Sequence, residues 1–403
     1  MRECKGALAA AIATIDAAAM LDETCTWAAI NTGTGNLAGL ARQAQALADA
    51  FAALPGEIAL VDPAPVTAID PSGQDTVLDH GRHLVLKVRP DAGRRMLLAG
   101  HMDTVYPADH PFQATRWRDE RTLNGPGVAD MKGGLSVLLH ALLAFERTTD
   151  AVRIGYDVLI NADEETGSLS SAGLIAELAQ GKCAALVYEP SARPDGTLAH
   201  RRGGSGNYSV VVAGRSAHAG RNPQDGRNAV VAAADLALRL KALDDDSLRV
   251  NPAKIEGGSG NNVVPDHAVL RFNIRPADDP AARRFPAAFR TLVEEVERTH
   301  DVTCRVHGGV SRPPKPVDAR AQALFNLVRE CGQALGQPIG WQPSGGVCDG
   351  NNIAACGVPV VDTMGVRGGA IHSTDEYLLT DSLAERAALS AAVLHRLAGG
   401  DLP

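Results

Sequence analysis

The sequence of 403 residues contains little that would mark a secreted, disulfide-stabilised protein. Its seven cysteines are odd in number and scattered, and no two of them form a Cys-x-x-Cys pair. Disulfide frameworks and zinc fingers need cysteines at short, regular spacings, so this pattern disfavours both. We therefore expect reduced thiols in a cytoplasmic protein.

Long apolar runs are also missing from the sequence. No uninterrupted apolar run approaches the roughly 20 residues that a membrane-spanning helix needs. The first twenty residues superficially resemble a secretion signal, but Asp16 interrupts them, and Leu8, Ile12 and Ile15 recur at helical spacing. This pattern favours an amphipathic first helix and predicts a protein without a membrane partner.

The sequence also lacks clusters of positively charged residues. The formal net charge is -8, and no block of Lys and Arg occurs anywhere in the chain. A polyanion would not be drawn to such a surface. We expect no nucleic-acid partner and favour small-molecule chemistry.

Two common catalytic glycine motifs are absent or misplaced. No Gly-x-Ser-x-Gly elbow occurs, which disfavours a serine hydrolase. Residues 31–39 nearly match a dinucleotide-binding pattern, but the third glycine is one residue late and no strand of β-branched residues precedes it. We interpret this stretch as a loop before a helix over 40–54, capped by Thr34 or Asn36.

The order of predicted elements divides the chain, which is too long for one ordinary core. Strand-like and helix-like stretches alternate in residues 1–202 and 315–403, which predicts one α/β domain around a mostly parallel sheet. Residues 203–314 follow a strand-helix-strand-strand-helix-strand order instead. That order is typical of a ferredoxin-like α+β domain, which we expect to be inserted into the first domain.

The apolar run 96–99 ends in a candidate metal ligand and its helper. His101 and Asp103 follow it two residues apart, so their side chains point to the same side of the strand end. His101 offers one ring nitrogen to a cation, and Asp103 could hold the other and fix the tautomer. Taken alone, a His-x-Asp pair is more often an ordinary loop contact.

Acidic residues follow two further predicted strands, at 156–162 and 185–188. The acidic run 163–165 ends the first strand, and Glu189 ends the second. Acids crowded at the end of a buried strand repel one another unless a cation neutralises them or they reach water. Because the carboxyl ends of parallel strands meet at one edge, we expect these acids to converge with His101.

Two more candidate ligands lie in glycine-rich loops. Asp130 lies in the turn-rich stretch 124–134, directly before an apolar helical pattern. A helix N-cap is the alternative role for this residue. His372 lies in a glycine-rich loop after the predicted strand 358–361, where a lone histidine would more often be structural.

These motifs, in this order, resemble the dinuclear zinc peptidase and deacylase family that includes glutamate carboxypeptidase, acetylornithine deacetylase and succinyl-diaminopimelate desuccinylase. The glutamate (folate-cleaving) carboxypeptidase branch is the most similar. The likeness rests on His101-Met102-Asp103-Thr104-Val105, the stretch Gly125 to Gly134 around Asp130, Asp163-Glu164-Glu165-Thr166-Gly167-Ser168, Glu189-Pro190, Ser216-Ala217-His218-Ala219-Gly220 and His372-Ser373.

The resemblance implies two Zn²⁺ per subunit, with Co²⁺ or Mn²⁺ as substitutes. Asp130 would bridge the two ions, with His101 and Glu189 completing one site and Glu165 and His372 the other. A carboxylate can span two cations, and Zn²⁺ accepts mixed nitrogen and oxygen ligands. In this family a cis peptide bond follows the bridging aspartate, which here implies one between Asp130 and Met131.

The resemblance also implies the catalytic and substrate-binding groups. Glu164 would be the general base and Asp103 the partner of His101. His218 would donate to the oxyanion from the other subunit of a homodimer, formed through an inserted domain that also acts as a lid. Substrate-binding roles fall to Arg275 and Asn262, with these weaker candidates: Arg312 and Gly350.

The expected activity is hydrolysis of an amide bond that releases a C-terminal amino acid, with glutamate as a candidate, from an N-acyl or peptidyl small molecule. Glu189 and Met131 depart from the carboxypeptidase pattern, so the branch of the family stays open. An N-acyl-amino-acid deacylase of the acetylornithine deacetylase type is therefore the alternative. A metal-free binding homologue is a third reading. A surface salt bridge is the alternative role for Arg275.

Overall fold

The computed structural model describes residues 2–401, with side chains from residue 6 onward, and the chain forms two compact units. The larger unit comprises Met1–Ala64, Asp79–Arg201 and Val317–Pro403. The smaller unit comprises Arg202–Pro316 together with Pro65–Leu78. The expected borders after residues 202 and 314 therefore lie within a few residues of the observed ones.

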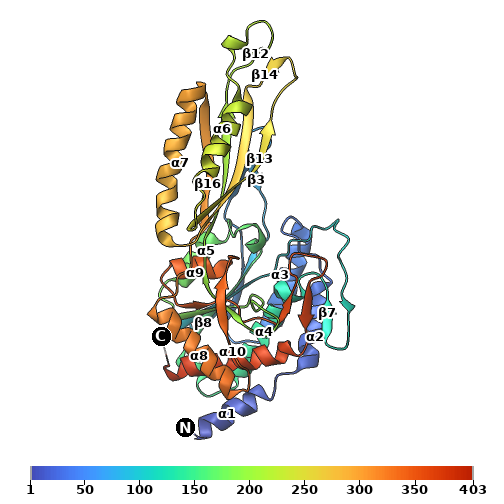
Figure 1. Cartoon of the computed structure of the whole chain (residues 1–403). Helices are drawn as coiled ribbons and strands as arrows, with labels where there is room; N and C mark the ends of the chain where they lie inside the picture. The colour runs from blue at the N-terminus through green and yellow to red at the C-terminus, as the bar shows by residue number, and fades with distance from the viewer. Residues whose placement is uncertain (1, 402–403) are drawn as a thin grey trace. The chain divides into compact units, whose positions relative to one another are not determined.

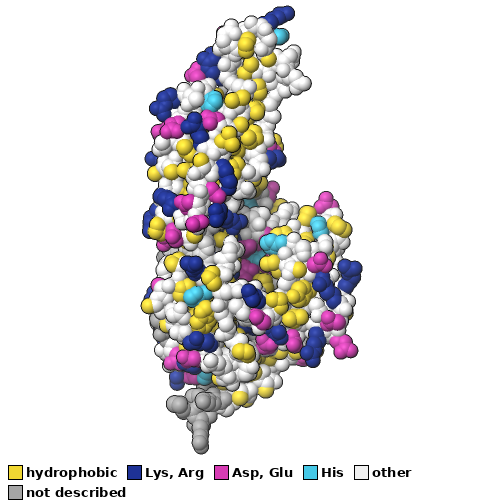
Figure 2. Space-filling model, in the orientation of Figure 1, with side chains coloured by type: hydrophobic (Ala, Val, Ile, Leu, Met, Phe, Trp, Pro, Cys, Tyr) yellow, Lys and Arg dark blue, Asp and Glu magenta, His cyan; other side chains and the backbone are white. Residues whose placement is uncertain are grey.

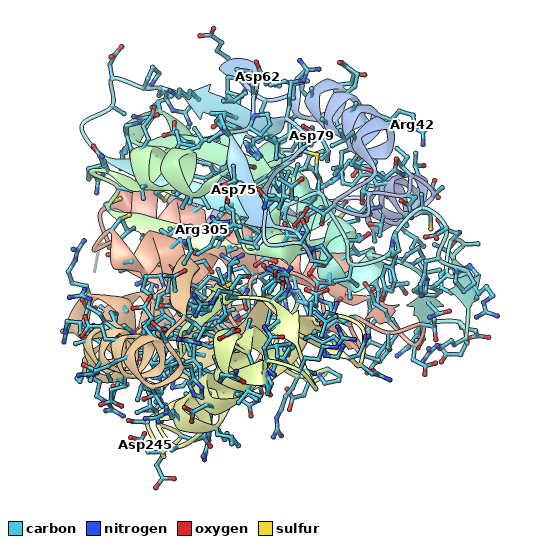
Figure 3. The ribbon with its side chains drawn as sticks, turned by 90° about the horizontal axis from the view of Figure 1, so that it is seen from above. Arg42, Asp62, Asp75, Asp79, Asp245 and Arg305 are labelled. Atoms are coloured by element: carbon cyan, nitrogen blue, oxygen red, sulfur yellow. The ribbon has the colours of Figure 1, made fainter. Side chains whose placement is uncertain are left out.

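The segment Pro65–Leu78 differs from expectation, because we assigned it to the catalytic domain and it groups with the smaller unit. It forms a hairpin of β2 (Val66–Ile69) and β3 (Asp75–Leu78). Arg305 donates hydrogen bonds to Asp75 of this hairpin and to the carbonyl of Gly73, and Figure 3 labels the Arg305–Asp75 pair. These contacts join segments far apart in sequence, so local patterning could not predict them.

The larger unit is built on a six-stranded sheet that is mostly parallel, as predicted. Strands β8, β5, β9 and β18 run parallel; at one edge β4 pairs antiparallel with β8, and β1 pairs antiparallel with β4. In spatial order the strands are β1 (Glu57–Val61), β4 (His83–Val88), β8 (Gly155–Asn161), β5 (Arg95–His101), β9 (Ala184–Val187) and β18 (Val360–Val361).

Helices cover both faces of this sheet, which explains the uninterrupted apolar run 96–99 within β5. Met96 and Leu98 contribute to one buried cluster, whereas Leu97 and Ala99 contribute to the other. The first cluster includes α4 (Gly133–Glu146) and α10 (Ser382–Gly399), and the second includes α5 (Ala172–Ala179) and α9 (Asp349–Ala355).

The N-terminal residues form more than the single helix that we expected. Helix α1 (Arg2–Ile12) ends before Ile15, and Asp16 caps a second helix, α2 (Ala17–Ala28), by accepting from the N–H groups of Ala18 and Ala19. Helix α3 (Leu37–Phe51) follows the glycine-rich loop. Asn36 is its cap, accepting from the Gly39 N–H at 3.1 Å, so that alternative is confirmed over Thr34.

The remaining elements of the larger unit are short strands and one helix. Strands β19, β20, β7 and β6 form a small antiparallel sheet, and β10 pairs with β17. Their bounds are β6 (Arg116–Trp117), β7 (Thr122–Asn124), β10 (Leu198–Arg202), α8 (Ala319–Ala334), β17 (Trp341–Ser344), β19 (Gly368–Gly369) and β20 (Tyr377–Leu379).

The smaller unit has the predicted strand-helix-strand-strand-helix-strand order (Figure 1). Its four-stranded antiparallel sheet has the order β13-β15-β11-β16, and both helices pack against one face around buried side chains such as Leu270 and Phe285. The elements are β11 (Ser205–Ala213), α6 (Ala229–Lys241), β13 (Leu248–Gly257), β15 (His267–Pro276), α7 (Asp279–His300) and β16 (Thr303–Arg312), with a small ribbon of β12 (Ala217–His218) and β14 (Val263–Val264).

Among residues 2–401, one stretch has the length and composition of a membrane-spanning helix. It is Val128–Glu146, of which 89% is buried inside the protein. That burial is typical of the core helix of a globular domain. The cysteines from Cys25 onward are free thiols, as expected for a protein without a disulfide framework.

Candidate metal centre

Three of the predicted ligand-bearing segments leave neighbouring parallel strands. Strand β5 lies between β8 and β9, and all three run in the same direction. His101 is the last residue of β5, the acidic run 163–165 follows β8, and Glu189 follows β9. The carboxyl edge of the sheet therefore gathers these side chains, although 88 positions of sequence separate His101 from Glu189.

The Asp130 carboxylate lies between two histidines. Its Oδ1 lies 3.1 Å from Nε2 of His101, and its Oδ2 lies 3.3 Å from Nε2 of His372. His101 Nε2 also lies 3.7 Å from Glu189, and His372 Nε2 lies 3.1 Å from Glu165. The two oxygens of one aspartate therefore face two separate groups of nitrogen and oxygen donors.

Asp130 is not a helix cap. It is 6% exposed in the turn Val128–Lys132, whose backbone is not helical at Asp130 and Met131, directly before α4. The peptide bond between Asp130 and Met131 is cis, as the family resemblance implied. Gly127 allows this turn, since its φ of 70° suits glycine and an added Cβ would lie 2.8 Å from the Thr104 side chain.

Asp103 holds the ends of two strands together. Its Oδ1 accepts the N–H of Glu164 at 3.1 Å, and its Oδ2 accepts the N–H of Glu165 at 3.2 Å. Oδ1 also lies 3.4 Å from Nδ1 of His101. One fully buried carboxylate thus fixes the backbone that carries both glutamates and faces the ring nitrogen of His101 that points away from Asp130.

Burial and charge perturb the pKa values of these groups strongly. Burial alone would raise the pKa of Asp130, but hydrogen bonds with His101 and His372 outweigh it and hold that pKa well below its usual range. Burial and the charge of Asp130 raise the pKa of Glu165 to about 7. Hydrogen bonds with Asp130 and Glu165 raise the pKa of His372 to about 11. The cluster therefore favours additional positive charge.

The donor set fits divalent metal ions. Ligand atoms of His101, Asp130 and Glu165 all lie within 4.8 Å of one another, and so do those of His101, Glu164 and Glu189. Imidazole nitrogens combined with carboxylates are typical ligands of Zn²⁺ and its neighbours in the first transition row. Buried acids that would otherwise repel one another are explained if cations lie among them.

Glu376 is a site residue that the sequence analysis missed. Its Oε1 accepts the N–H groups of Ala129 and Asp130, and its Oε2 accepts the N–H of Gly127 at 3.1 Å. The Tyr106 hydroxyl donates to the same carboxylate at 3.0 Å. Glu376 thereby anchors the Asp130 turn to the loop that carries His372. Its position four residues after His372 was the only sequence signal available.

The four predicted substrate-binding residues lie in different surroundings. Gly350 lies in α9, where an added Cβ would lie 2.6 Å from the Asp362 side chain, so close packing is sufficient reason for a glycine. Arg312 ends β16 and is 2% exposed. Arg275 is exposed on the polar face of β15 and donates to Asn273 at 2.9 Å. Asn262 is exposed beside β14.

His218 lies in β12 of the smaller unit and is exposed. Its Nδ1 accepts the backbone N–H groups of Gly220 and Arg221 at 3.1 and 3.2 Å. A neutral ring with Nδ1 as acceptor carries its proton on Nε2. His218 therefore presents a hydrogen-bond donor to its surroundings.

Known proteins are similar to this chain over most of its length. Carboxypeptidase G2 of Pseudomonas sp. (strain RS-16) is 32% identical over 335 residues, which is 79% of this chain and 78% of that protein. Succinyl-diaminopimelate desuccinylase of Xanthomonas euvesicatoria pv. vesicatoria (strain 85-10) is 27% identical over 323 residues, which is 75% of this chain and 83% of that protein.

Solved structures share the fold. The M20 family metallo-carboxypeptidase Sso-CP2 from Sulfolobus solfataricus superposes with a TM-score of 0.70, covering 93% of this chain and 98% of that chain at 16% identity. The sequence profile of peptidase family M20/M25/M40 matches residues 97–396, a range that includes every strand end and loop bearing a candidate ligand. The expected family is thus confirmed: this chain belongs to peptidase family M20/M25/M40 and is a hydrolase of amide bonds.

Proposed function

We propose that this chain is a metal-dependent hydrolase that releases the C-terminal amino acid, with glutamate as the candidate, from an N-acyl or peptidyl small molecule. The observation that carries the proposal is the Asp130 carboxylate, whose two oxygens face His101 and His372 at 3.1 and 3.3 Å. Such a carboxylate is suited to bridging two cations.

These distances support two metal positions. His101, Glu189 and one oxygen of Asp130 would hold one ion, and Glu165, His372 and the other oxygen would hold the second. Zn²⁺ suits this mixture of imidazole and carboxylate ligands, and Co²⁺ or Mn²⁺ could substitute. When bound, the metal pair would lower the pKa of a water molecule and polarise the scissile carbonyl.

Glu164 is the proposed general base. It would accept the proton of the attacking water and return it to the leaving nitrogen. Its carboxylate lies within 4.8 Å of ligand atoms of His101 and Glu189, so it faces the space in which the reaction would occur. Asp103 fixes the backbone of Glu164, since the Glu164 N–H donates to the buried Asp103 carboxylate.

The smaller unit would supply substrate contacts. The Nε2–H of His218 is suited to donate to a developing oxyanion, and in the proposed homodimer it would come from the other subunit. Arg275 is the proposed partner of the substrate carboxylate, because an exposed guanidinium can bind it bidentately. Asn262 would add a neutral contact.

The proposed partner is a small molecule, and the proposed location is the cytoplasm. The face drawn in Figure 2 shows Lys and Arg side chains interspersed with Asp and Glu. That mixture favours a small molecule over a polyanion as partner. Reduced thiols support a cytoplasmic location.

A deacylase of N-acyl amino acids remains the second candidate function. The name of the Xanthomonas relative favours it, because a desuccinylase also cleaves an amide. The two functions share the same site and differ only in the acyl group.

Metal analysis combined with a substrate panel tests the proposal. We expect about two transition-metal ions per chain by mass spectrometry, and loss of hydrolysis on chelation with recovery on adding Zn²⁺ or Co²⁺. The panel comprises N-acyl amino acids, dipeptides and folates. Undiminished hydrolysis after complete metal removal would refute the proposal, and a chain that binds no metal would favour the binding homologue.

A further inference from the structure

Asp349 is a buried carboxylate that is not among the candidate site residues. It is the first residue of α9 and is 2% exposed. Its Oδ1 accepts the Ser168 hydroxyl at 2.5 Å, and its Oδ2 accepts the side-chain amide of Asn161 at 2.6 Å. All three residues lie in the larger unit. Removing a carboxylate from water costs free energy, which hydrogen bonds such as these offset.

The two partners of Asp349 lie at either end of the segment that carries Glu164. Asn161 is the last residue of β8, and Ser168 ends the turn that follows this strand. Within that turn, the Gly167 N–H donates to the Glu164 carbonyl at 2.8 Å. One carboxylate therefore fixes both ends of the segment, and the turn connects these fixed ends to Glu164.

The backbone of Ser168 needs support from its surroundings. Its φ is 55°, in the left-handed region that residues other than glycine rarely occupy. Such a conformation persists only where surrounding contacts hold it. The hydroxyl bond to Asp349 is one such contact, and the bond from the Ser168 N–H to the Asp163 carbonyl at 2.8 Å is another.

Of the two glutamates in this turn, Glu164 depends more on the protein for its position. Glu165 is a proposed metal ligand, so the bound ion would itself hold the Glu165 carboxylate. Glu164 is the proposed base and would be positioned by the backbone that carries it. A displacement of about 1 Å in a catalytic group can lower a rate by about 100-fold, so this backbone has to be fixed.

We propose that Asp349 is a positioning residue for Glu164 and acts through Ser168 and Asn161. The inference rests on the proposed function, in which Glu164 accepts the proton of the attacking water. The alternative role for Asp349 is to stabilise the start of α9, because an acidic side chain is favourable in the first turn of a helix. Asp279 occupies the same position in α7 and provides a matched control.

Ser168→Ala tests the hydroxyl contact and leaves the Asp349 carboxylate in place. In metal-loaded protein, with the compound of the panel that the wild type hydrolyses fastest, we expect kcat to fall about tenfold. KM and metal content should stay within about twofold of the wild type, because the metal ligands are not displaced. The matched control is Ser136→Ala, which should change none of these quantities. Ser136 is also buried, and its hydroxyl donates to the Glu23 carboxylate at 2.9 Å.

Combining Ser168→Ala with Glu164→Gln separates positioning from general damage to the fold. In the Glu164→Gln background the base is already removed, so Ser168→Ala should change kcat by less than about twofold. Hydrogen exchange of residues 162–168 in the metal-loaded protein should be faster in Ser168→Ala than in the wild type. This second measurement does not depend on turnover.

Asp349→Ala removes both side-chain contacts and should lower kcat by about 100-fold, whereas Asp279→Ala should leave it unchanged. The double variant with Ser168→Ala should lose no more activity than Asp349→Ala alone, because both substitutions break the same contact. If Asp349→Ala does not fold, Ser168→Ala in the two backgrounds decides the question.

The outcomes separate this inference from the proposed function. The same fractional loss of kcat from Ser168→Ala with and without the Glu164 carboxylate would overturn the positioning role and leave amide hydrolysis intact. A fall in metal content together with kcat would also overturn it, because Asp349 would then position the ligand Glu165. Absence of hydrolysis of the whole panel by metal-loaded wild-type protein would overturn the proposed function, and the assignment of Glu164 as base with it.

Discussion

The Asp130 carboxylate shows how much chemistry depends on a single side chain. It is buried, yet its pKa is lowered, because histidines lie on both sides of it. His101 and His372 come from segments 271 positions apart in the sequence. An aspartate that was equally compatible with an ordinary helix cap is thereby placed between two groups of metal donors.

Substitution of Glu164 should reduce catalysis without reducing metal binding. Glu164→Gln keeps the size of the side chain but removes its basicity, so we expect kcat to fall by about 10²- to 10⁴-fold while metal content stays near that of the wild type. Steady-state kinetics and metal analysis of the same preparation check both expectations. Glu177→Gln, an exposed glutamate on α5, is the matched control and should change neither quantity.

A fall in metal content together with activity would contradict this assignment. In that case Glu164 would be a ligand, a role that its position beside His101 and Glu189 also permits geometrically.

At the scale of elements, Glu376 connects the loop after β19 to the turn before α4. It accepts three backbone N–H groups of that turn. Glu376→Gln would place an amide N–H₂ against N–H donors, so we expect a loss of about 1–3 kcal/mol in the free energy of unfolding. Metal affinity should fall by about 10- to 100-fold, because the Asp130 turn would no longer be fixed.

Chelator competition measures the affinity, and urea unfolding of the metal-free protein measures the stability. Leu236→Ala in the core of the smaller unit is the control, since it should destabilise by about 2–5 kcal/mol without changing metal affinity. If Glu376→Gln merely matches this control, Glu376 has no positioning role.

Strand β4 contains a histidine that should make stability depend on pH. His83 is 1% exposed, its Nδ1 accepts the Ala162 N–H at 3.3 Å, and burial lowers its pKa. The folded state therefore binds a proton less readily than the unfolded state, whose histidine has a pKa of about 6.5. The stabilisation is complete above that pH and is lost as the pH falls below it.

His83→Asn retains an acceptor for the Ala162 N–H and removes the titrating ring. We expect the variant to lose less stability than the wild type between pH 7 and pH 5, as measured by urea unfolding at both values. Equal losses in the two proteins would show that His83 is not responsible.

At the scale of the whole molecule, metal binding should stabilise the two units unequally. All the proposed ligands lie in the larger unit. An ion that binds only the folded state at 100 times its Kd contributes about 2.7 kcal/mol. We expect chelation to reduce hydrogen-exchange protection in β5, β8, β9 and the Asp130 turn, and to leave β11, β13, β15 and β16 unchanged.

Hydrogen exchange followed by mass spectrometry resolves these segments in one experiment. A comparable loss of protection in the smaller unit would contradict the placement of both ions in the larger unit.

Much of this architecture could be predicted from local sequence. The apolar run 96–99, the acids that end the strands on either side of it and the element order of residues 203–314 all correspond to elements that the structure contains. Apolar periodicity and strand ends are local properties, so one sequence is sufficient to identify them. The Asn36 cap was predictable to within two alternatives for the same reason.

By itself, the sequence determined the family motifs, the mostly parallel sheet and the set of candidate ligands. Only the tertiary structure decided which oxygen of Asp130 faces which histidine, that Glu376 anchors a turn 246 positions earlier, and that the hairpin Pro65–Leu78 joins the smaller unit. The physical reason is that these features are contacts between distant segments. Their geometry depends on how loops pass over a packed core, which no local periodicity encodes.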